Sequence, residues 1–149
     1  MKIVIQRVSE SSVKVDGKIV GEIGTGFMLL CGIDESDENE DADWLVKKVL
    51  DLRIFGDEDD KLNLSIKDIK GEILCISQFT LIADYKKGNR PSFIKAAKPD
   101  KAIPLFEYFK TELKKSGLKI ESGIFGADMK VSLINDGPVT IVMDSKTKA

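Results

Sequence analysis

The sequence predicts an α+β domain in which a mainly antiparallel, barrel-like β-sheet is accompanied by two helices. The first observation is that short segments rich in Val and Ile recur through most of the chain. The second is that only residues 37–52 and 99–115 place apolar side chains at helical spacing. The third is the length of 149 residues, which suits one domain over residues 1–149 whose core needs neither disulfide nor metal.

The N-terminal part of the chain is expected to form strands. Residues 2–9 begin with an apolar run and then alternate, and residues 12–20 carry Asp16-Gly17 between alternating segments. Asp-Gly in this setting is the strongest short-range signal for a hairpin. The segment 27–31 is apolar and bracketed by glycines, which predicts a buried strand.

The two helices are predicted over residues 37–52 and 99–115. The first begins inside an acidic stretch, residues 34–43, because negative charge is favourable near a helix N-terminus. The stretch also lacks the glycine turn and the terminal Glu of a calcium loop. The second helix begins at Pro99 and stops before Gly117.

A polar loop over residues 56–61 and a central strand starting at Ile73 lie between the helices. Three strand-like segments follow the second helix, at residues 118–121, 129–134 and 139–143. The last residues, 145–149, are expected to be a frayed tail.

The absence of histidine from the chain excludes Ser-His-Asp and Cys-His nucleophiles, His-containing zinc sites and His general bases. Cys31 and Cys75 lie in apolar runs, so we expect reduced core thiols rather than a disulfide or metal ligands. We therefore expect no metal site and no cofactor. Catalysis has to use hydroxyls, carboxylates, lysines, backbone dipoles or the substrate itself.

The stretch Ser77-Gln78-Phe79-Thr80 places polar side chains where the central strand leaves the core. Two hydroxyls and an amide around one aromatic ring can bind a carbonyl, polarise it and present it to water or to a nucleophile. The same residues equally suit a structural role, because Ser and Thr commonly make local hydrogen bonds at strand ends. The residues alone leave both interpretations open.

The charge distribution favours contact with a few phosphates rather than with a long duplex. The net charge of −2 gives no overall field that attracts nucleic acid. Residues 84–101 are nevertheless basic, with Lys86, Lys87, Arg90, Lys95, Lys98 and Lys101 against Asp84 and Asp100. A solvated loop is the commoner explanation of clustered lysines.

The N-terminus carries too short an apolar run for a signal peptide, and no stretch approaches the ~20 apolar residues of a membrane span. We therefore expect a cytoplasmic protein without a membrane partner.

Six motifs spread along the chain carry a resemblance to a known family. They are Gln6-Arg7-Val8, Arg53-Ile54-Phe55, Ser77-Gln78-Phe79-Thr80-Leu81, Arg90-Pro91-Ser92-Phe93, Ala127-Asp128-Met129 and Asn135-Asp136-Gly137-Pro138-Val139-Thr140. With them the chain closely resembles D-aminoacyl-tRNA deacylases of the bacterial and eukaryotic type over essentially its whole length. It departs from that pattern at Ile141-Val142, where aromatic residues are expected, with little bearing on the site.

The resemblance implies a homodimer that hydrolyses the ester between a D-amino acid and the 3′ adenosine of tRNA and rejects L-aminoacyl-tRNA. It also implies a cis peptide bond between Gly137 and Pro138. This element reaches into the pocket of the neighbouring subunit, opposite residues 77–80. Without the resemblance, Asp136-Gly137-Pro138 indicates an ordinary trans turn. Several D-amino acids, several tRNAs and glycyl-tRNA stay open as substrates.

The resemblance also gives roles to individual residues. Ser77 and Gln78 orient the substrate, Phe79 packs beneath it, and the backbone N–H groups near Phe79 and Thr80 bind the oxyanion. Thr80 is either the nucleophile or a water-positioning group. Because the chain offers no obvious base beside Thr80, we favour assistance from the 2′-hydroxyl of the substrate.

The remaining roles concern the adenosine, the Gly-Pro element and the tRNA. Phe125 and Met129 line the adenosine side, and Arg7 braces the Gly-Pro element. Contacts to tRNA phosphates fall to Lys86, Lys87 and Arg90. The alternatives are a non-catalytic nucleic-acid-binding module that uses the patch from Lys86 to Lys101, and a hydrolase of free D-amino-acid esters.

Overall fold

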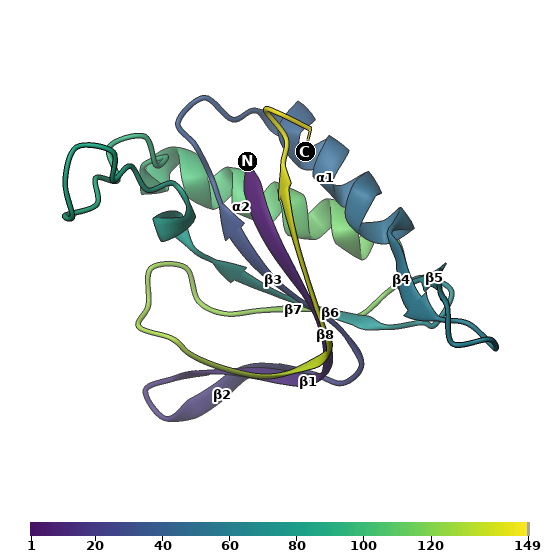
Figure 1. Cartoon of the computed structure of the whole chain (residues 1–149). Coiled ribbons are helices and arrows are strands. Elements are labelled where there is room, and N and C mark those ends of the chain that lie inside the picture. Colours follow the sequence, from purple (N-terminus) through teal and green to yellow (C-terminus); the bar gives the residue numbers. More distant parts are fainter. Residues whose placement is uncertain (149) are drawn as a thin grey trace.

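Strand β1 (Lys2–Val15) organises the fold of the computed structural model, which describes residues 1–148. It pairs antiparallel with β2 (Lys18–Ile23), β3 (Gly26–Gly32) and β8 (Lys130–Asp144). Two further strands extend the sheet in parallel pairings, β6 (Glu72–Ser77) beside β3 and β7 (Ile120–Ser122) beside β6. Figure 1 shows that β1 bends, so that its second half and β2 form a lower layer beneath β3 and β6.

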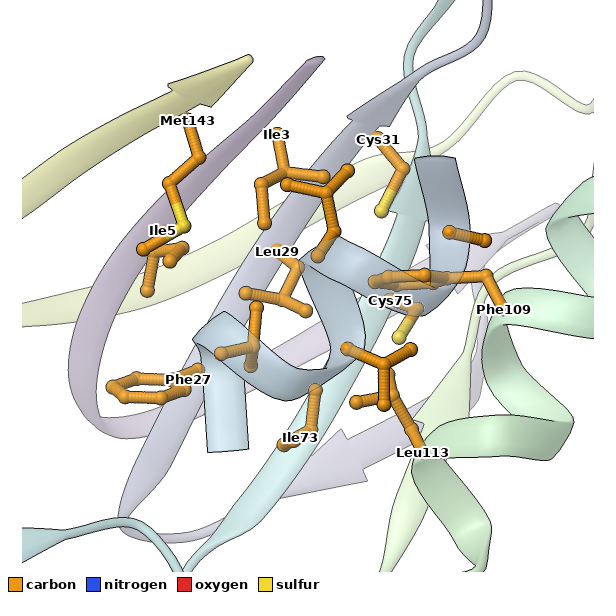
Figure 2. Packing of buried hydrophobic residues seen from close by; sticks show 14 of the residues in the cluster. Ile3, Ile5, Phe27, Leu29, Cys31, Ile73, Cys75, Phe109, Leu113 and Met143 are labelled. Atoms are coloured by element: carbon orange, nitrogen blue, oxygen red, sulfur yellow. The ribbon is translucent and has the colours of Figure 1, made fainter. Parts of the chain in front are cut away.

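Helices α1 (Asn39–Asp51) and α2 (Pro99–Lys114) lie together above the other side of the sheet (Figure 1). Figure 2 shows Phe109 and Leu113 packed over side chains from the sheet. The buried residues that the sheet contributes to this cluster include Ile3, Ile5, Phe27, Leu29, Ile73 and Cys75. The helices thus cover one face of the sheet.

A second, smaller cluster fills the space between the sheet and the lower layer. Met28, Leu74 and Ile76 alternate with the residues of the first cluster and pack against Val8 and Val13. Both faces of β3 and β6 are therefore buried, which explains why these two strands are almost continuously apolar.

Most of the predicted elements are confirmed. The hairpin forms at Asp16-Gly17, where φ is 51° and 77° and Val15 pairs with Lys18. The segment 27–31 lies in β3, the strand starting at Ile73 lies in β6, and both helices end within two residues of their predicted limits. The α+β class with a mainly antiparallel, barrel-like sheet is likewise confirmed.

Two strand breaks were predicted wrongly, and one hairpin was not predicted. The segments 129–134 and 139–143 are parts of one strand, β8, because both pair with the bent strand β1. The separation of residues 2–9 from 12–20 is wrong in the same way, since β1 continues to Val15. Two short strands, β4 (Arg53–Gly56) and β5 (Leu62–Ser65), flank the polar loop and form a separate hairpin that was not predicted.

The expectation of a frayed tail is wrong for Ser145, which is buried. Its N–H donates to the carbonyl of Met1 at 2.9 Å, and its Oγ accepts from the Met1 ammonium at 2.7 Å. The same ammonium forms a buried ion pair with Asp37 at 2.5 Å. These contacts join both ends of the described chain to the start of α1. Ala149 lies outside the described residues.

Cys31 and Cys75 are free and buried, as the sequence predicts. Among residues 1–148, no helix is long and apolar enough to cross a membrane.

Candidate active site

The chain turns sharply after β6 and forms the short 3₁₀ helix η1 (Phe79–Leu81). The Gln78 N–H donates to the carbonyl of Cys31 at 2.7 Å, and the Ile82 N–H donates to the carbonyl of Phe79 at 2.9 Å. Within residues 1–148, neither the Phe79 nor the Thr80 amide N–H has a hydrogen-bond acceptor. The first N–H groups of a helix have no partner within the helix, so these two donors are available to a ligand.

A cavity of about 260 Å³ opens at this strand end. One wall is formed by the ends of β3 and β6, another by Ala97 and Ala102 beside the start of α2, and a third by residues 125–131. The lining side chains with chemical interest are Ser77, Gln78, Phe79, Phe125, Asp128 and Met129. The structure therefore brings five of the sequence-predicted site residues, together with Asp128, around one hollow.

Phe79 and Thr80 differ in their relation to this cavity. The Phe79 ring is 57% exposed, although large apolar side chains are usually buried, and it contacts Phe93 edge to face with the ring centroids 5.2 Å apart. Thr80 is not among the lining residues. Its hydroxyl accepts a hydrogen bond from Nε2 of Gln78, which fixes the orientation of the amide.

The wall formed by residues 125–131 is anchored to the rest of the domain. The Gly123 N–H donates to the carbonyl of Cys75 at 3.2 Å, and the sulfur of Met129 lies directly over Gly123, where a Cβ atom would displace the Met129 side chain. The Phe125 ring packs on Phe106 of α2 with the centroids 6.3 Å apart. No local pattern in the sequence indicates this wall, which only the family resemblance predicts.

Gly137 and Pro138 lie on a large bulge of β8. Asn135 pairs with Val8 and Thr140 pairs with Gln6, so residues 136–139 stand opposite Arg7 alone. The peptide bond between Gly137 and Pro138 is cis, as the resemblance implies, and both residues are exposed. A proline within a sheet is confined to edges and bulges, and here the bulge presents it to the outside.

Two side chains hold the bulge in shape. Nε of Arg7 donates to the carbonyl of Asp136 at 3.0 Å, and Nη1 donates to the carbonyl of Ile54 at 2.7 Å. Asn135 accepts from the Val139 N–H at 2.9 Å and donates to the Thr140 hydroxyl at 2.8 Å. Arg7 contacts the bulge as the resemblance implies, whereas the part played by Asn135 was not predicted.

The strand end and the bulge do not meet within one chain. None of Arg7, Gly137 and Pro138 belongs to the residues that line the cavity. The chain therefore carries the two elements in separate places.

Lys86, Lys87 and Arg90 lie in an exposed loop closed by two hydrogen bonds between Asp84 and Ser92, of 2.8 and 2.7 Å. Within the described part of the chain, none of the three forms an ion pair. None of them lines the cavity. Their positive charges are therefore not paired with a described carboxylate, but they lie outside the cavity.

The cysteines are not suited to nucleophilic chemistry. Burial raises the pKa of the Cys31 thiol well above its usual range, and burial raises the pKa of Cys75 to about 12. Both thiols are protonated at neutral pH, whereas the thiolate is the reactive form. Residues 1–148 contain no cluster of three or more Cys, Asp or Glu residues that could hold a metal ion.

Comparison with known proteins identifies similar sequences and structures. The sequence model of a family described as D-Tyr-tRNA(Tyr) deacylase matches residues 4–144. The D-aminoacyl-tRNA deacylases of Flavobacterium psychrophilum and Bacteroides thetaiotaomicron are 60% and 58% identical to this chain over 149 residues, which is 99% of each chain.

Two solved structures share the architecture. A c-Myc DNA unwinding element binding protein superposes with a TM-score of 0.90 at 42% identity, over 97% of this chain and 98% of that protein. A probable eukaryotic D-amino acid tRNA deacylase superposes with a TM-score of 0.80, over 95% of this chain and 97% of the other. Its identity is 18%, so it shows the common fold alone.

Proposed function

Because the chain belongs to the D-Tyr-tRNA(Tyr) deacylase family, we propose that it hydrolyses the ester between a D-amino acid and the 3′ adenosine of tRNA. The observation that carries the proposal is the pair of amide N–H groups of Phe79 and Thr80, which have no acceptor within residues 1–148 and follow the strand end where a cavity of about 260 Å³ opens. Backbone donors held in place without acceptors are the usual means of stabilising the oxyanion of acyl transfer. The enzyme that we propose is cytoplasmic, because its substrate is an aminoacyl-tRNA.

The reaction starts with attack of water on the ester carbonyl carbon. The carbonyl electron pair moves to the oxygen, and the Phe79 and Thr80 N–H groups hold the resulting oxyanion. The intermediate then expels the 3′ oxygen of the ribose, and the proton from the attacking water passes to that oxygen. The products are a D-amino acid and uncharged tRNA.

The proton transfer uses the substrate, because no histidine exists in the chain and, among residues 1–148, no base contacts Thr80. The adjacent ribose 2′-hydroxyl relays the proton, because it accepts the proton from water and donates its own proton to the leaving 3′ oxygen. Thr80 already accepts a hydrogen bond from Gln78 and acts by orienting that amide. Ser77 and Gln78 orient the ester, and Phe79 packs beneath it.

The site is completed by the Gly137-Pro138 bulge of a second subunit in a homodimer. In this chain the bulge is exposed and absent from its own cavity, which supports a target in another protomer. Exposed apolar side chains on the same strand, Ile134 at 53% and Val142 at 62%, would be covered by such a partner. A two-fold axis gives two equivalent sites.

The bulge sets the chirality of the substrate. Main-chain carbonyls of Gly137 and Pro138 hold the α-ammonium and leave no space for a side chain of L configuration. Phe125 and Met129 receive the adenosine on the apolar side of the cavity. Lys86, Lys87 and Arg90 contact tRNA phosphates.

A non-catalytic nucleic-acid-binding module is less well supported. Such a module would use only the exposed basic loop. It would give no role to the cavity or to the amide N–H groups of Phe79 and Thr80. Such a module would keep its nucleic-acid binding after substitution of Thr80 or Gly137 and lose it on reversal of the basic charges.

The experiment that tests the proposal is incubation of the protein with D- and L-tyrosyl-tRNA, with and without EDTA. We expect hydrolysis of the D-ester, little hydrolysis of the L-ester and no effect of the chelator, because carboxylates alone hold metals weakly. Equal hydrolysis of both esters would contradict the chirality, and activity lost in EDTA and restored by zinc would contradict the site.

A further inference from the structure

A second hollow, of about 370 Å³, lies next to the candidate active site. Its lining includes Lys2, Asp34, Ile82, Tyr85, Lys86 and Lys95. Three chain segments contribute to both hollows, since residues 33, 79 and 97 line the first, whereas 34, 82 and 95 line the second. Consecutive Cα atoms are about 3.8 Å apart, so no more than about 11 Å separates the two linings along any of these segments. A ligand that fills the active site therefore needs to extend only a short way to enter the second hollow.

The second hollow carries free positive charge. Its lysines, Lys2, Lys86 and Lys95, outnumber its carboxylates, Asp34 and Asp84. Across residues 1–148, none of these lysines forms an ion pair. The carboxylates are already engaged with neighbouring groups.

Those engagements are local hydrogen bonds. Asp34 accepts from the N–H and the hydroxyl of Ser36, at 2.9 and 2.8 Å, and Asp84 accepts from the Lys86 N–H at 3.0 Å. These hydrogen bonds do not cancel the carboxylate charges, but three lysines against two carboxylates leave one excess positive charge, and within residues 1–148 none of the ammonium groups is paired with a carboxylate. The hollow therefore favours an anion from outside the chain.

The rim of the hollow carries an exposed aromatic ring. Tyr85 is 72% exposed, and no aromatic neighbour packs against it among the described residues. Aromatic rings beside unpaired lysines are the combination that proteins use for single-stranded nucleic acid, with bases stacked on the ring and phosphates held by the cations.

We propose that this hollow binds the unpaired nucleotides that precede the terminal adenosine of the substrate RNA. Lys2 and Lys95 hold a phosphate, and Tyr85 stacks on a base. The inference rests on the proposed function, because the terminal adenosine has to occupy the neighbouring cavity. It assigns a site to the single-stranded 3′ end in which Lys86 joins Lys2 and Lys95, beside the contacts proposed for Lys87 and Arg90.

The experiment compares two substrates, D-tyrosyl-tRNA and the minimal ester D-tyrosyl-adenosine, which has no preceding nucleotides. The test variant is K2Q/K95Q. The matched control is K70Q/K119Q, since these lysines are also exposed, form no ion pair within residues 1–148, and line a different hollow of about 400 Å³.

We expect K2Q/K95Q to lower kcat/KM on the tRNA ester by about tenfold and to leave the adenosine ester within about twofold. The slope of log kcat/KM against log salt on the tRNA ester should become shallower by about 0.7 for each phosphate that the variant no longer neutralises. The K70Q/K119Q control should match the wild type on both substrates.

Tyr85 provides an independent variant. Y85A should lower kcat/KM on the tRNA ester by about fivefold or more, whereas Y85F keeps the ring and should keep the activity. Neither change should affect the adenosine ester.

Three outcomes would overturn the inference. They are equal losses on both substrates, wild-type activity of K2Q/K95Q on the tRNA ester, and an equal loss in the K70Q/K119Q control. If the wild type cleaves neither ester, the proposed function fails. Binding of uncharged tRNA then tests separately whether the second hollow binds RNA. Weaker binding by K2Q/K95Q but not by K70Q/K119Q supports the site, and equal binding by both overturns it.

Discussion

The strand end at Ser77–Thr80 and the bulge at Asn135–Thr140 are built in opposite ways. At the strand end two amide N–H groups have no acceptor within residues 1–148, and an aromatic ring stands in solvent. At the bulge, Arg7 and Asn135 hold the main chain with side-chain hydrogen bonds, yet the bulge itself is exposed. The first region thus offers free hydrogen-bond donors beside a cavity, and the second offers a fixed main-chain projection. The dimer that we propose brings the two together.

The largest effect is expected from Gly137→Ala. A Cβ atom there would lie 2.9 Å from Nη2 of Arg7, 2.9 Å from Cγ2 of Val139 and 3.0 Å from the Val139 nitrogen, at a φ of +134°. The bulge has to shift, so D-tyrosyl-tRNA hydrolysis should fall by about a hundredfold or more. Single-turnover assays measure the loss, and sedimentation should still show the wild-type assembly.

Gly88→Ala is the matched control for that variant. Gly88 has nearly the same φ, +132°, but a Cβ atom there meets nothing within 4 Å. Gly88→Ala should share the backbone strain and keep most of the activity. Comparable losses in the two variants would show that strain, rather than the position of the bulge, is responsible.

A smaller effect is expected from Thr80→Ala. If Thr80 only orients Gln78, its loss should cost about 1–3 kcal/mol of transition-state stabilisation, which is roughly a ten- to hundredfold loss of kcat. Loss of a true nucleophile should be far larger. Rate measurement with denaturing mass spectrometry distinguishes the two, because an acyl group trapped on Thr80 would refute the orienting role.

The smallest effect on activity is expected from a third region, the hydrogen-bonded network at the chain ends, which contacts neither the strand end nor the bulge. Burial alone would raise the pKa of Asp41, but hydrogen bonds from the Glu38 N–H and Ser145 outweigh it. Together with Lys146 they lower the pKa to about 2. A lowered pKa means that the ionised form stabilises the fold.

The resulting stability is present above the unfolded-state pKa of about 3.9 and is lost as the pH falls towards 2. Asp41→Asn should therefore lower the free energy of unfolding at pH 7 and weaken its dependence on pH between about 4 and 2. Urea titrations at several pH values measure both quantities. An unchanged acid dependence would contradict the role of Asp41, and lost activity in the folded variant would contradict the separation of this network from the site.

The part of the fold that the sequence predicts depends on local chemistry. Asp16-Gly17 specifies its hairpin and Pro99 starts its helix regardless of what packs against them. The break in β8 was predicted because Asn135 to Pro138 has the composition of a turn. Pairing with the bent strand β1 overrides that local preference and converts the turn into a bulge.

The residues of the candidate site likewise divide into those that a local pattern predicts and those that it does not. The polar strand end at Ser77–Thr80 is visible as a local pattern, because hydroxyl and amide groups interrupt an apolar run. The wall with Phe125 and Met129 is not, since it depends on packing against residues distant in sequence, such as Phe106 and Gly123. The proposed counterpart of Gly137 belongs to a second subunit, so neither the local pattern nor one chain contains it.

The measurement that tests the shared site most directly is complementation between two defective subunits. Gly137→Ala and Thr80→Ala proteins are mixed in equal amounts, allowed to exchange subunits, and assayed on D-tyrosyl-tRNA. In a mixed dimer the strand end of one subunit and the bulge of the other form one intact site, so random exchange should restore about a quarter of the wild-type activity. Activity that never exceeds the mean of the two separate variants would contradict the account.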